Sequence, residues 1–373
     1  MRILVISPAL YPCATGGVEI FNYYFIKELA KKGHQVWVLT TCEYEWDNPN
    51  IFPVKLSRRV FLHPKLSVGI HILFNLIKLR GRIDIIHVPY TSNSPLVYPV
   101  LLAKKLDGVS YVITIHGGGM YAWKPWAPHK AFFQYADGIV AVSETIRKEY
   151  ESRSGREIKV ISPLIPFTES EISKHSARIQ YGLNDQDIII LYVGSIKRIK
   201  GPEILLDAFL KLRKDYIKKH SLRLLYVGNG DMKTVLEKKV NEKGFNEFVT
   251  FLGKVPHEQL PQIYSMADIY VIPSLFEGTP VALLEAMFNG LAIVGANTPG
   301  INNLINHKRN GLLFESENSG DLAAKIREFV QNGDLPRKLG ETAKRDYAES
   351  YSFDDVILQH IDLCAAALGN RNG

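Results

Sequence analysis

Two glutamates, eight residues apart in a mostly apolar stretch, are the side chains of this chain best placed to do chemistry. Glu285 lies among Leu283 to Phe288, which predict a helix that is buried on nearly all sides. A carboxylate in such a place needs partners, and the hydroxyl groups of a ribose or a hexose ring would supply them. Glu277 falls in the loop before this helix. The alternative is an ion-paired core Glu285 with a solvated Glu277, and the spacing alone favours neither.

The start of the same helix has the features of an anion site. Pro280 suits the first helical position, where its missing N–H costs nothing, and Thr279 is the predicted N-cap. Gly278 has no Cβ, so a ligand can approach its backbone closely. The first N–H groups of the helix, near Val281, and the helix dipole together favour a phosphate. The segment therefore predicts a diphosphate clamp between the two glutamates.

Two other loops follow predicted strands and could meet the same diphosphate. Gly16 and Gly17 stand at a strand-to-helix turn, where backbone N–H groups can bind phosphate, although a plain tight turn is the alternative. The loop Gly194 to Gly201 holds three cations in four residues, Arg198 and Lys200 among them. A solvated charge run is the ordinary interpretation, but at a strand end these cations could neutralise a diphosphate.

A histidine also stands at a strand end. The predicted strand 111–115 runs into His116, which three glycines follow. A histidine at the mouth of a strand can hydrogen-bond a substrate, and a bond to local backbone is the alternative. The turn Gly228 to Asp231 is a further glycine-rich edge, either a simple turn or a place where a nucleotide lies.

Strand-like and helix-like segments alternate twice along the chain, and this rhythm predicts parallel sheets covered on both faces. The expected strands are 2–7, 34–40, 84–88, 111–115, 138–142, 158–161, 188–193, 222–227, 248–252, 268–272, 292–295 and 311–313. The expected helices are 18–32, 68–80, 94–106, 127–135, 143–152, 201–216, 231–243, 257–265, 280–289, 318–332, 334–348 and 353–368.

The fold class predicted from this pattern is α/β, with two doubly wound, Rossmann-like domains facing each other across a cleft. A proline-rich stretch, Ser162 to Phe167, separates the two series. The domains are expected to be 1–165 and 166–350. Residues 351–373 would form a helix that packs back on the first domain. Ligands of such sheets bind beyond the carboxyl ends of the strands, where all the motifs above lie.

Composition describes an ordinary soluble globular protein, with 46% hydrophobic and 22% charged residues. No apolar run approaches the roughly 20 residues that a membrane-spanning helix needs. Cys13, Cys42 and Cys364 have no metal or redox spacing. They favour free thiols in a reducing compartment, which predicts a cytoplasmic location.

The whole excess of positive charge lies in the first half. Residues 1–170 hold 20 Lys and Arg against 13 Asp and Glu, whereas the rest of the chain is balanced. Residues 55–82 contain seven cations and one apolar run, 68–77, with no acidic residue. Such a segment can contact the anionic inner face of a membrane, and a core-facing helix with solvated charges is the equal alternative. No nucleic-acid-binding signature is present, so nucleic acid is not an expected partner.

Together these motifs resemble the retaining glycosyltransferases of family GT4, which have the GT-B fold. The likeness covers nearly the whole chain. Its most specific part is the pair Glu277 and Glu285, which matches the E-x7-E element of the family. Gly16-Gly17 matches the amino-terminal glycine loop, and Gly194 to Gly201 matches the basic motif at a strand end.

The resemblance implies an amino-terminal acceptor domain and a carboxy-terminal domain for the nucleotide-sugar donor. Lys200 would neutralise the donor diphosphate, Glu285 would hold the ribose, and Val255 would lie beside the base. Ser195 stands where the family often has Arg, so Arg198 or Lys197 compensates, or diphosphate binding is weaker. The implied donor-binding residues are Gly16, Gly17, Ser195, Arg198, Lys200, Val255, Gly278, Thr279, Pro280, Val281 and Glu285.

The implied catalytic residues are His116, Glu277 and Lys200. His116 would bond the sugar and stabilise charge at the reacting centre, and Glu277 would lie near the sugar hydroxyls. The resemblance implies transfer with retention, in which the leaving phosphate takes the acceptor's proton. It implies no cofactor and no essential metal.

The expected function is transfer of a hexose-type sugar from a nucleotide sugar to a glycan or lipid-linked acceptor in cell-surface polysaccharide assembly. A UDP-sugar is the favoured donor, with GDP-mannose as the alternative. Two other functions stay open at this point. One is a nucleotide-sugar epimerase or hydrolase of the same architecture, and the other is a non-enzymatic protein that binds a nucleotide sugar or a glycan.

Overall fold

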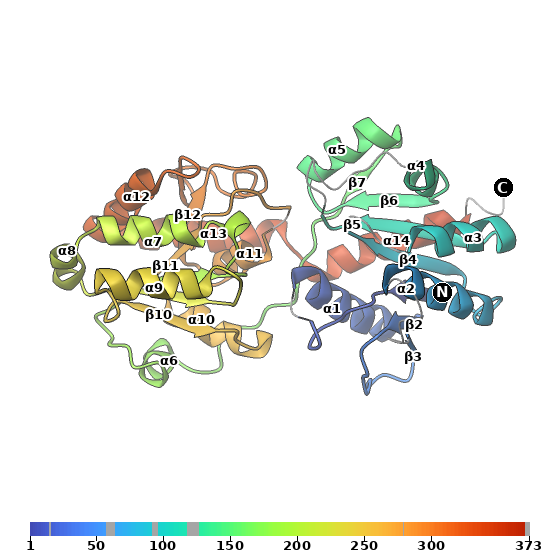
Figure 1. The fold of residues 1–373 in the computed structure, drawn as a ribbon, viewed down its shortest axis with the longest axis horizontal. Helices are drawn as coiled ribbons and strands as arrows, with labels where there is room; N and C mark the ends of the chain where they lie inside the picture. The colour runs from blue at the N-terminus through green and yellow to red at the C-terminus, as the bar shows by residue number, and fades with distance from the viewer. Residues whose placement is uncertain (15, 57–63, 92–95, 118–126, 279, 370–373) are drawn as a thin grey trace. The chain divides into compact units, whose positions relative to one another are not determined.

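The computed structural model describes residues 1–14, 16–56, 64–91, 96–117, 127–278 and 280–369 (Figure 1). The chain divides into two compact units, each built around one parallel sheet. The first unit is Met1–Pro166 together with Ser352–Gly373, and the second is Phe167–Tyr351. The predicted α/β class, with two doubly wound sheets, is confirmed.

The first unit holds a seven-stranded sheet in the order β3-β2-β1-β4-β5-β6-β7. Its strands are β1 (Arg2–Ile6), β2 (Gln35–Thr40), β3 (Ile51–Lys55), β4 (Ile85–Tyr90), β5 (Ser110–Ile115), β6 (Gly138–Ala141) and β7 (Lys159–Val160). β4 and β5 are buried at every position, as expected of parallel strands covered on both faces. The strand order reverses between β1 and β4, which are hydrogen-bonded neighbours.

Helices cover both faces of this sheet. One face shares a core with α2 (Pro64–Lys78), α3 (Val97–Asp107), α4 (Ala127–Gln134) and α5 (Glu144–Ser154). The other face packs against α1 (Gly17–Lys31) and α14 (Phe353–Gly369). His87 of β4 points to this second face, since its neighbours Ile86 and Val88 belong to the core of the first. The last helix of the chain is therefore part of the first unit (Figure 1).

The second unit holds a six-stranded sheet in the order β10-β9-β8-β11-β12-β13. Its strands are β8 (Ile188–Val193), β9 (Leu222–Val227), β10 (Val249–Gly253), β11 (Ile269–Ile272), β12 (Ala292–Ala296) and β13 (Leu312–Phe314). β8 pairs directly with β11 although two strands separate them in sequence. The order reverses here, so the loops after β8 and β11 leave the same edge of the sheet side by side.

The helices of the second unit alternate with these strands. They are α6 (Lys174–Gln180), α7 (Pro202–Lys211), α8 (Lys214–Lys219), α9 (Lys233–Lys243), α10 (Leu260–Met266), α11 (Val281–Phe288), α12 (Ser319–Gln331) and α13 (Asp334–Ser350). Two single turns of 3₁₀ helix, η1 (Arg198–Lys200) and η2 (His257–Gln259), lie in the loops after β8 and β10.

Three elements differ from the prediction. β3 was not expected, because Pro53 interrupts its pattern, but a proline is tolerated in an edge strand. α6 follows the proline-rich stretch in a segment for which no helix was predicted, and Arg178 holds it by a hydrogen bond to the carboxylate of Asp268. The helix expected over 201–216 is broken at Arg213, which has a left-handed φ of 66°. No glycine marks that break in the sequence.

Candidate active site

Lys200 and Glu277 meet at the edge of the second sheet where the strand order reverses. Lys200 ends the turn η1 after β8, and Glu277 lies in the loop after β11. The Lys200 Nζ donates to both carboxylate oxygens of Glu277, at 2.8 and 2.7 Å. Glu277 is 9% exposed, whereas the Lys200 side chain is 30% exposed, so the carboxylate is buried and the lysine stays partly open to solvent. Two residues that the sequence assigned to separate motifs therefore act as one group.

The backbone around Lys200 is held against the neighbouring loop. Gly201 has a φ of 61°, and a Cβ on it would lie 2.2 Å from the carbonyl oxygen of Pro273. The Leu275 N–H donates to the Ile199 carbonyl across the same junction, at 3.0 Å. Only glycine permits this approach, because any side chain would push the two loops apart. The contact fixes where the Lys200 side chain begins.

The other two cations of the basic loop have a different environment. Lys197 and Arg198 are exposed, and neither forms an ion pair with the described residues. Ser195 is half-buried, and its carbonyl accepts a hydrogen bond from the Tyr192 hydroxyl at 2.8 Å. The loop thus presents two solvent-facing positive charges beside the Lys200–Glu277 pair, which suits it to an anionic ligand.

The glycine-rich turn after β9 supports this loop. A Cβ on Gly228 would lie 1.9 Å from the carbonyl oxygen of Gly194. The Ile196 N–H donates to the Asn229 carbonyl at 3.0 Å. The sequence left open whether Gly228 to Asp231 is a simple turn or a place where a nucleotide lies. The contacts described here are those of a turn that packs closely against the basic loop.

Helix α11 begins one residue later than predicted. Pro280 has φ −76° and ψ 94°, which is extended, so it occupies the cap position and Val281 is the first helical residue. The expectation that Pro280 would be the first helical residue is therefore wrong. Gly278 is half-buried in the loop before it. The predicted N-cap, Thr279, lies outside the described residues.

Glu285 is buried in the second turn of α11, with 3% of its surface exposed. The Tyr264 hydroxyl on α10 donates to its Oε2, and the His257 Nε2 lies 3.6 Å from its Oε1. Burial and the charge of Glu285 raise the pKa of Tyr264 well above its usual value, so this hydroxyl stays protonated. The carboxylate therefore has two protein partners that were not among the predicted site residues. His257 could have been suspected from the sequence, because it stands two residues after Val255, which the resemblance places beside the base. The structure shows Val255 half-buried.

A buried tyrosine lies near both glutamates. Burial raises the pKa of Tyr270 on β11, and the charges of Glu285 and Glu277 raise it further. Its ring centroid lies 6.2 Å from that of Tyr264, the donor to Glu285. The Lys200–Glu277 pair and the Glu285 network therefore belong to one polar cluster around β11, which we call the β11 cluster.

The glycine loop of the first unit carries a carboxylate. Gly16 is the N-cap of α1, and both Gly16 and Gly17 are exposed. The Glu19 Oε2 lies 2.2 Å from the place that a Cβ on Gly16 would occupy. An anion at this helix start would therefore meet Glu19 unless that flexible side chain turned away. Glu19 was not among the predicted site residues.

His116 directly follows β5 and is half-buried. Its ring lies 5.5 Å from that of Phe21, and its Nε2 is shielded from solvent without a hydrogen-bond partner among the described residues. Burial and the neighbouring His360 lower the pKa of His116 to about 3. A neutral imidazole can exchange hydrogen bonds with a sugar hydroxyl, but it offers no full positive charge.

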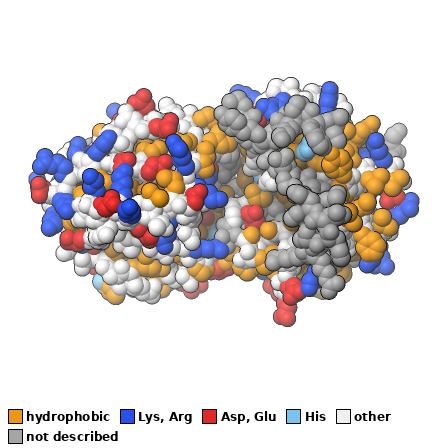
Figure 2. Space-filling view, in the orientation of Figure 1, with side chains coloured by type: hydrophobic (Ala, Val, Ile, Leu, Met, Phe, Trp, Pro, Cys, Tyr) orange, Lys and Arg blue, Asp and Glu red, His pale blue; other side chains and the backbone are white. Residues whose placement is uncertain are grey.

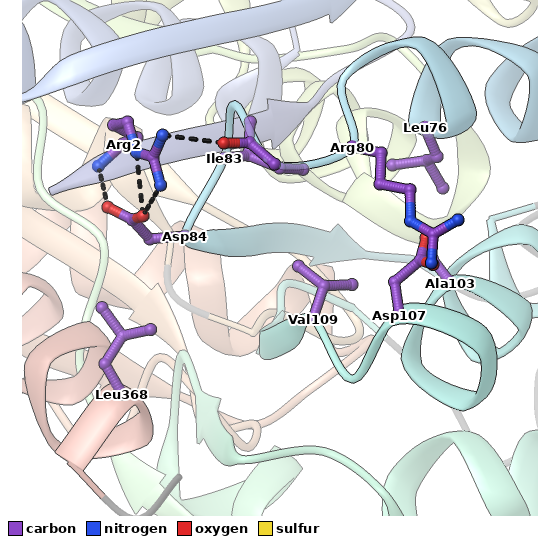
Figure 3. A pocket seen from close by; sticks show the side chains of 10 residues that line it. Arg2, Leu76, Arg80, Ile83, Asp84, Ala103, Asp107, Val109 and Leu368 are labelled. Atoms are coloured by element: carbon purple, nitrogen blue, oxygen red, sulfur yellow. Dashed lines mark hydrogen bonds and ion pairs between the residues drawn. The ribbon is translucent and has the colours of Figure 1, made fainter. Parts of the chain in front are cut away.

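A cavity of about 500 Å³ lies at the other edge of the first sheet (Figure 3). Arg2, Asp84 and Val109 line it, at the amino ends of β1, β4 and β5. Its cations are already paired, Arg2 with Asp84 and Arg80 with Asp107. Ligands of open parallel sheets bind at the carboxyl ends of strands, so this cavity is separate from the candidate site.

Comparisons with known proteins agree with this geometry. The family model described as "Glycosyl transferases group 1" matches residues 173–346, and that described as "Glycosyltransferase Family 4" matches residues 15–168. The chain belongs to the group 1 glycosyltransferases. The expected family is thus confirmed, and transferase activity is favoured over the hydrolase, epimerase and binding-protein alternatives.

The similarity to known proteins extends over nearly the whole length of this glycosyltransferase. An uncharacterised glycosyltransferase of Methanocaldococcus jannaschii is 27% identical, with 99% of each chain covered. The N-acetyl-alpha-D-glucosaminyl L-malate synthase of Bacillus anthracis is 23% identical, over 96% of this chain and 95% of the other. Anabaena HepE in complex with UDP-glucose has a TM-score of 0.80 at 16% identity, over 98% of this chain and 100% of HepE. The GT-B fold is thereby confirmed.

Proposed function

We propose that this glycosyltransferase moves a hexose-type sugar, with retention of configuration, from a nucleotide-diphosphate sugar to a glycan or glycolipid acceptor in cell-surface polysaccharide assembly. The observation that carries the proposal is the Lys200–Glu277 ion pair, which lies at the strand switch beside the exposed Lys197 and Arg198. The solved structure of HepE holds UDP-glucose on a similar fold, which supports a UDP-sugar as donor. GDP-mannose is the alternative donor.

The proposed roles follow from the chemistry of each side chain. Lys200 and Arg198 would neutralise the diphosphate, with the N–H groups at the start of α11. Glu277 would accept hydrogen bonds from the sugar, and Glu285 from the ribose. His116 would hydrogen-bond the sugar as a neutral imidazole. The departing phosphate would take the acceptor's proton, so no protein nucleophile is needed.

The proposal includes no cofactor and no essential metal. Within the described ranges, no group of three or more His, Cys, Asp or Glu side chains is arranged to hold a metal ion. Metal independence stays a prediction, which an activity assay with and without a chelator would check. The cations of the basic loop would take the place of a metal at the diphosphate.

The donor is tested by thermal unfolding in the presence of UDP-glucose, GDP-mannose, UDP or GDP. A ligand at 100 times its Kd adds about 2.7 kcal/mol to the free energy of unfolding. We expect the uridine ligands to raise Tm, and Lys200→Ala to abolish the shift. Lys219→Ala, an exposed cation on α8, is the control and should keep it. If none of the four ligands shifts Tm of the native protein, the donor-site proposal fails.

The acceptor is proposed to be membrane-proximal. The basic excess of the first half and its apolar segment support an enzyme that works on the cytoplasmic side, at the inner face of a membrane. Product analysis with lipid-linked and soluble acceptors, under one UDP-sugar, would identify the class. Turnover of donor with every acceptor absent would instead favour a hydrolase.

A further inference from the structure

Helix α2 is apolar on two sides. It buries Ile72 and Leu76 in the core of the first unit, and it also exposes Ile70, Phe74 and Ile77. These three are 53%, 56% and 58% exposed. Their spacing of four and three residues places them in one stripe along the helix. A helix that only covered a core would carry polar side chains there.

Helix α3 repeats the arrangement. It buries Val97 and Val100, and it exposes Tyr98, Leu102 and Leu106 at 53%, 38% and 66%. α2 and α3 pack against each other and share one core over the same face of the sheet. Both exposed stripes therefore face away from that side of the sheet. Figure 2 shows hydrophobic side chains gathered over these helices. We call these six exposed side chains the α2–α3 surface.

The segment that carries the α2–α3 surface has an excess of positive charge. Residues 64–107 hold six Lys and Arg against two Asp. Both aspartates are already paired, Asp84 with Arg2 and Asp107 with Arg80. Of the cations, Lys104 is paired with Asp137 outside this segment. Lys78 instead lies with its Nζ 4.5 Å from the ring centroid of Phe74. Its ammonium group thus stays at the surface above an apolar side chain, as lysines do at a lipid interface.

The same arrangement occurs beside α3. The Lys105 Nζ lies 5.9 Å from the ring centroid of Tyr135, which is 52% exposed. Neither Lys78 nor Lys105 forms an ion pair with the described residues. A second copy of the chain would bring the same positive charge to this surface and would be repelled. An anionic layer with an apolar interior complements both properties.

We propose that the α2–α3 surface binds the anionic face of a lipid bilayer, with its apolar side chains entering the acyl boundary and Lys78 and Lys105 at the headgroups. Its purpose rests on the proposed function, since a docked enzyme would meet a lipid-linked acceptor. Among the described residues no helix is long and apolar enough to cross a membrane, so the contact would be peripheral.

The test is flotation of the full chain with vesicles of phosphatidylcholine alone or with 30% phosphatidylglycerol. We expect binding to the anionic vesicles that weakens as salt rises. The double variant Phe74→Ser/Leu102→Ser should lower the partition coefficient at least tenfold. Lys78→Gln/Lys105→Gln should lower it about 25-fold, roughly fivefold for each cation. Ile179→Ser/Val235→Ser removes two apolar side chains of the second unit that are more exposed than Phe74 and Leu102, and it should leave binding unchanged.

Three outcomes would overturn the proposal. The first is no flotation of the native chain with anionic vesicles, and the second is equal flotation of the Phe74→Ser/Leu102→Ser variant. The third is a native chain that is a dimer by light scattering and a Phe74→Ser/Leu102→Ser variant that is a monomer. The surface would then join two copies of the chain. The Tm shift with UDP-glucose is measured on the same variants. If that shift persists without flotation, the bilayer proposal fails while the proposed function stands.

Discussion

Lys200 and Glu277, which are 77 residues apart in sequence, form a two-pronged ion pair at the carboxyl edge of the second sheet. The contact exists because β8 and β11 are hydrogen-bonded neighbours, so the loops that follow them meet. A donor sugar that enters this site would meet a paired ammonium and carboxylate rather than an isolated cation. The pair can therefore bind diphosphate and sugar hydroxyl groups through adjacent atoms.

The first prediction concerns the coupling within this pair. Lys200→Ala and Glu277→Gln should each lower kcat/KM at least 100-fold, which is about 2.7 kcal/mol of transition-state stabilisation. The double variant should be less than tenfold worse than the poorer single variant, because the two side chains act as a unit. Steady-state kinetics with the identified donor measures all three.

Lys197→Ala is the matched control for that cycle, since this exposed cation of the same loop has no ion-pair partner in the described part of the chain. It should lower kcat/KM by less than tenfold. Strict additivity of Lys200→Ala and Glu277→Gln would show that the two residues act independently and would contradict a shared role.

The second prediction concerns Tyr264, whose hydroxyl donates to buried Glu285. Tyr264→Phe leaves a buried carboxylate with one donor fewer, so the free energy of unfolding should fall by about 1–3 kcal/mol. The KM for the donor should rise several-fold, because Glu285 loses its orientation, while kcat changes little. Tyr226→Phe is the control, since this buried hydroxyl donates to the Pro202 carbonyl. Tyr226→Phe should lower the free energy of unfolding and leave the KM for the donor unchanged. An equal rise of KM in both variants would refute the role of Tyr264 in positioning Glu285.

The third prediction compares two glycines of the second unit that have similar positive φ angles. Gly201 and Gly182 have φ values of 61° and 66°, but a Cβ has no neighbour within 4 Å at Gly182. Gly182→Ala should therefore cost only the left-handed backbone penalty, about 1 kcal/mol. Gly201→Ala must also displace the Pro273 carbonyl, so it should cost at least about 2 kcal/mol more.

Chemical denaturation of both variants measures that difference. Because Gly201 adjoins Lys200, its variant should also lose donor binding in the thermal-shift assay. Equal free energies of unfolding for the two alanine variants would mean that the contact between the loops after β8 and β11 is not tight.

The fourth prediction concerns acid stability of the first unit. His116, His87 and His360 lie around Phe21 and Phe25. Burial and the neighbouring histidines lower the pKa of His87 well below its usual value, and burial lowers the pKa of His360 to about 4. These folded-state values lie below that of an unfolded histidine, near 6.5, so the unfolded chain takes up protons first. Stability is therefore full above about pH 6.5 and falls as the pH drops toward 4.

Each histidine should contribute up to about 1.4 kcal/mol per pH unit in this window. Urea denaturation between pH 4.5 and 7.5 measures the slope. His360→Gln should make this slope shallower, because one histidine with a lowered folded-state pKa is removed. An unchanged slope in His360→Gln would mean that this histidine is already protonated in the folded chain.

Local pattern was sufficient for most elements. The strands 188–193 and 222–227 have the predicted bounds, because parallel strands buried on both faces appear as unbroken apolar runs. β3 and α6 were not predicted. Pro53 interrupts the strand pattern of β3, and α6 is short and polar. The break at Arg213 has no neighbouring glycine or proline to mark it in the sequence.

The sequence by itself determined the doubly wound fold, the family, and the strand ends at which the chemistry lies. Only the tertiary structure decided which of those residues are partners. Lys200 pairs with Glu277 because β11, three strands further along the chain, lies beside β8. Glu285 contacts Tyr264 of helix α10 and His257 of the turn η2, which lie between β10 and β11. The order of strands depends on packing over the whole sheet, so it cannot be predicted from a short stretch of sequence.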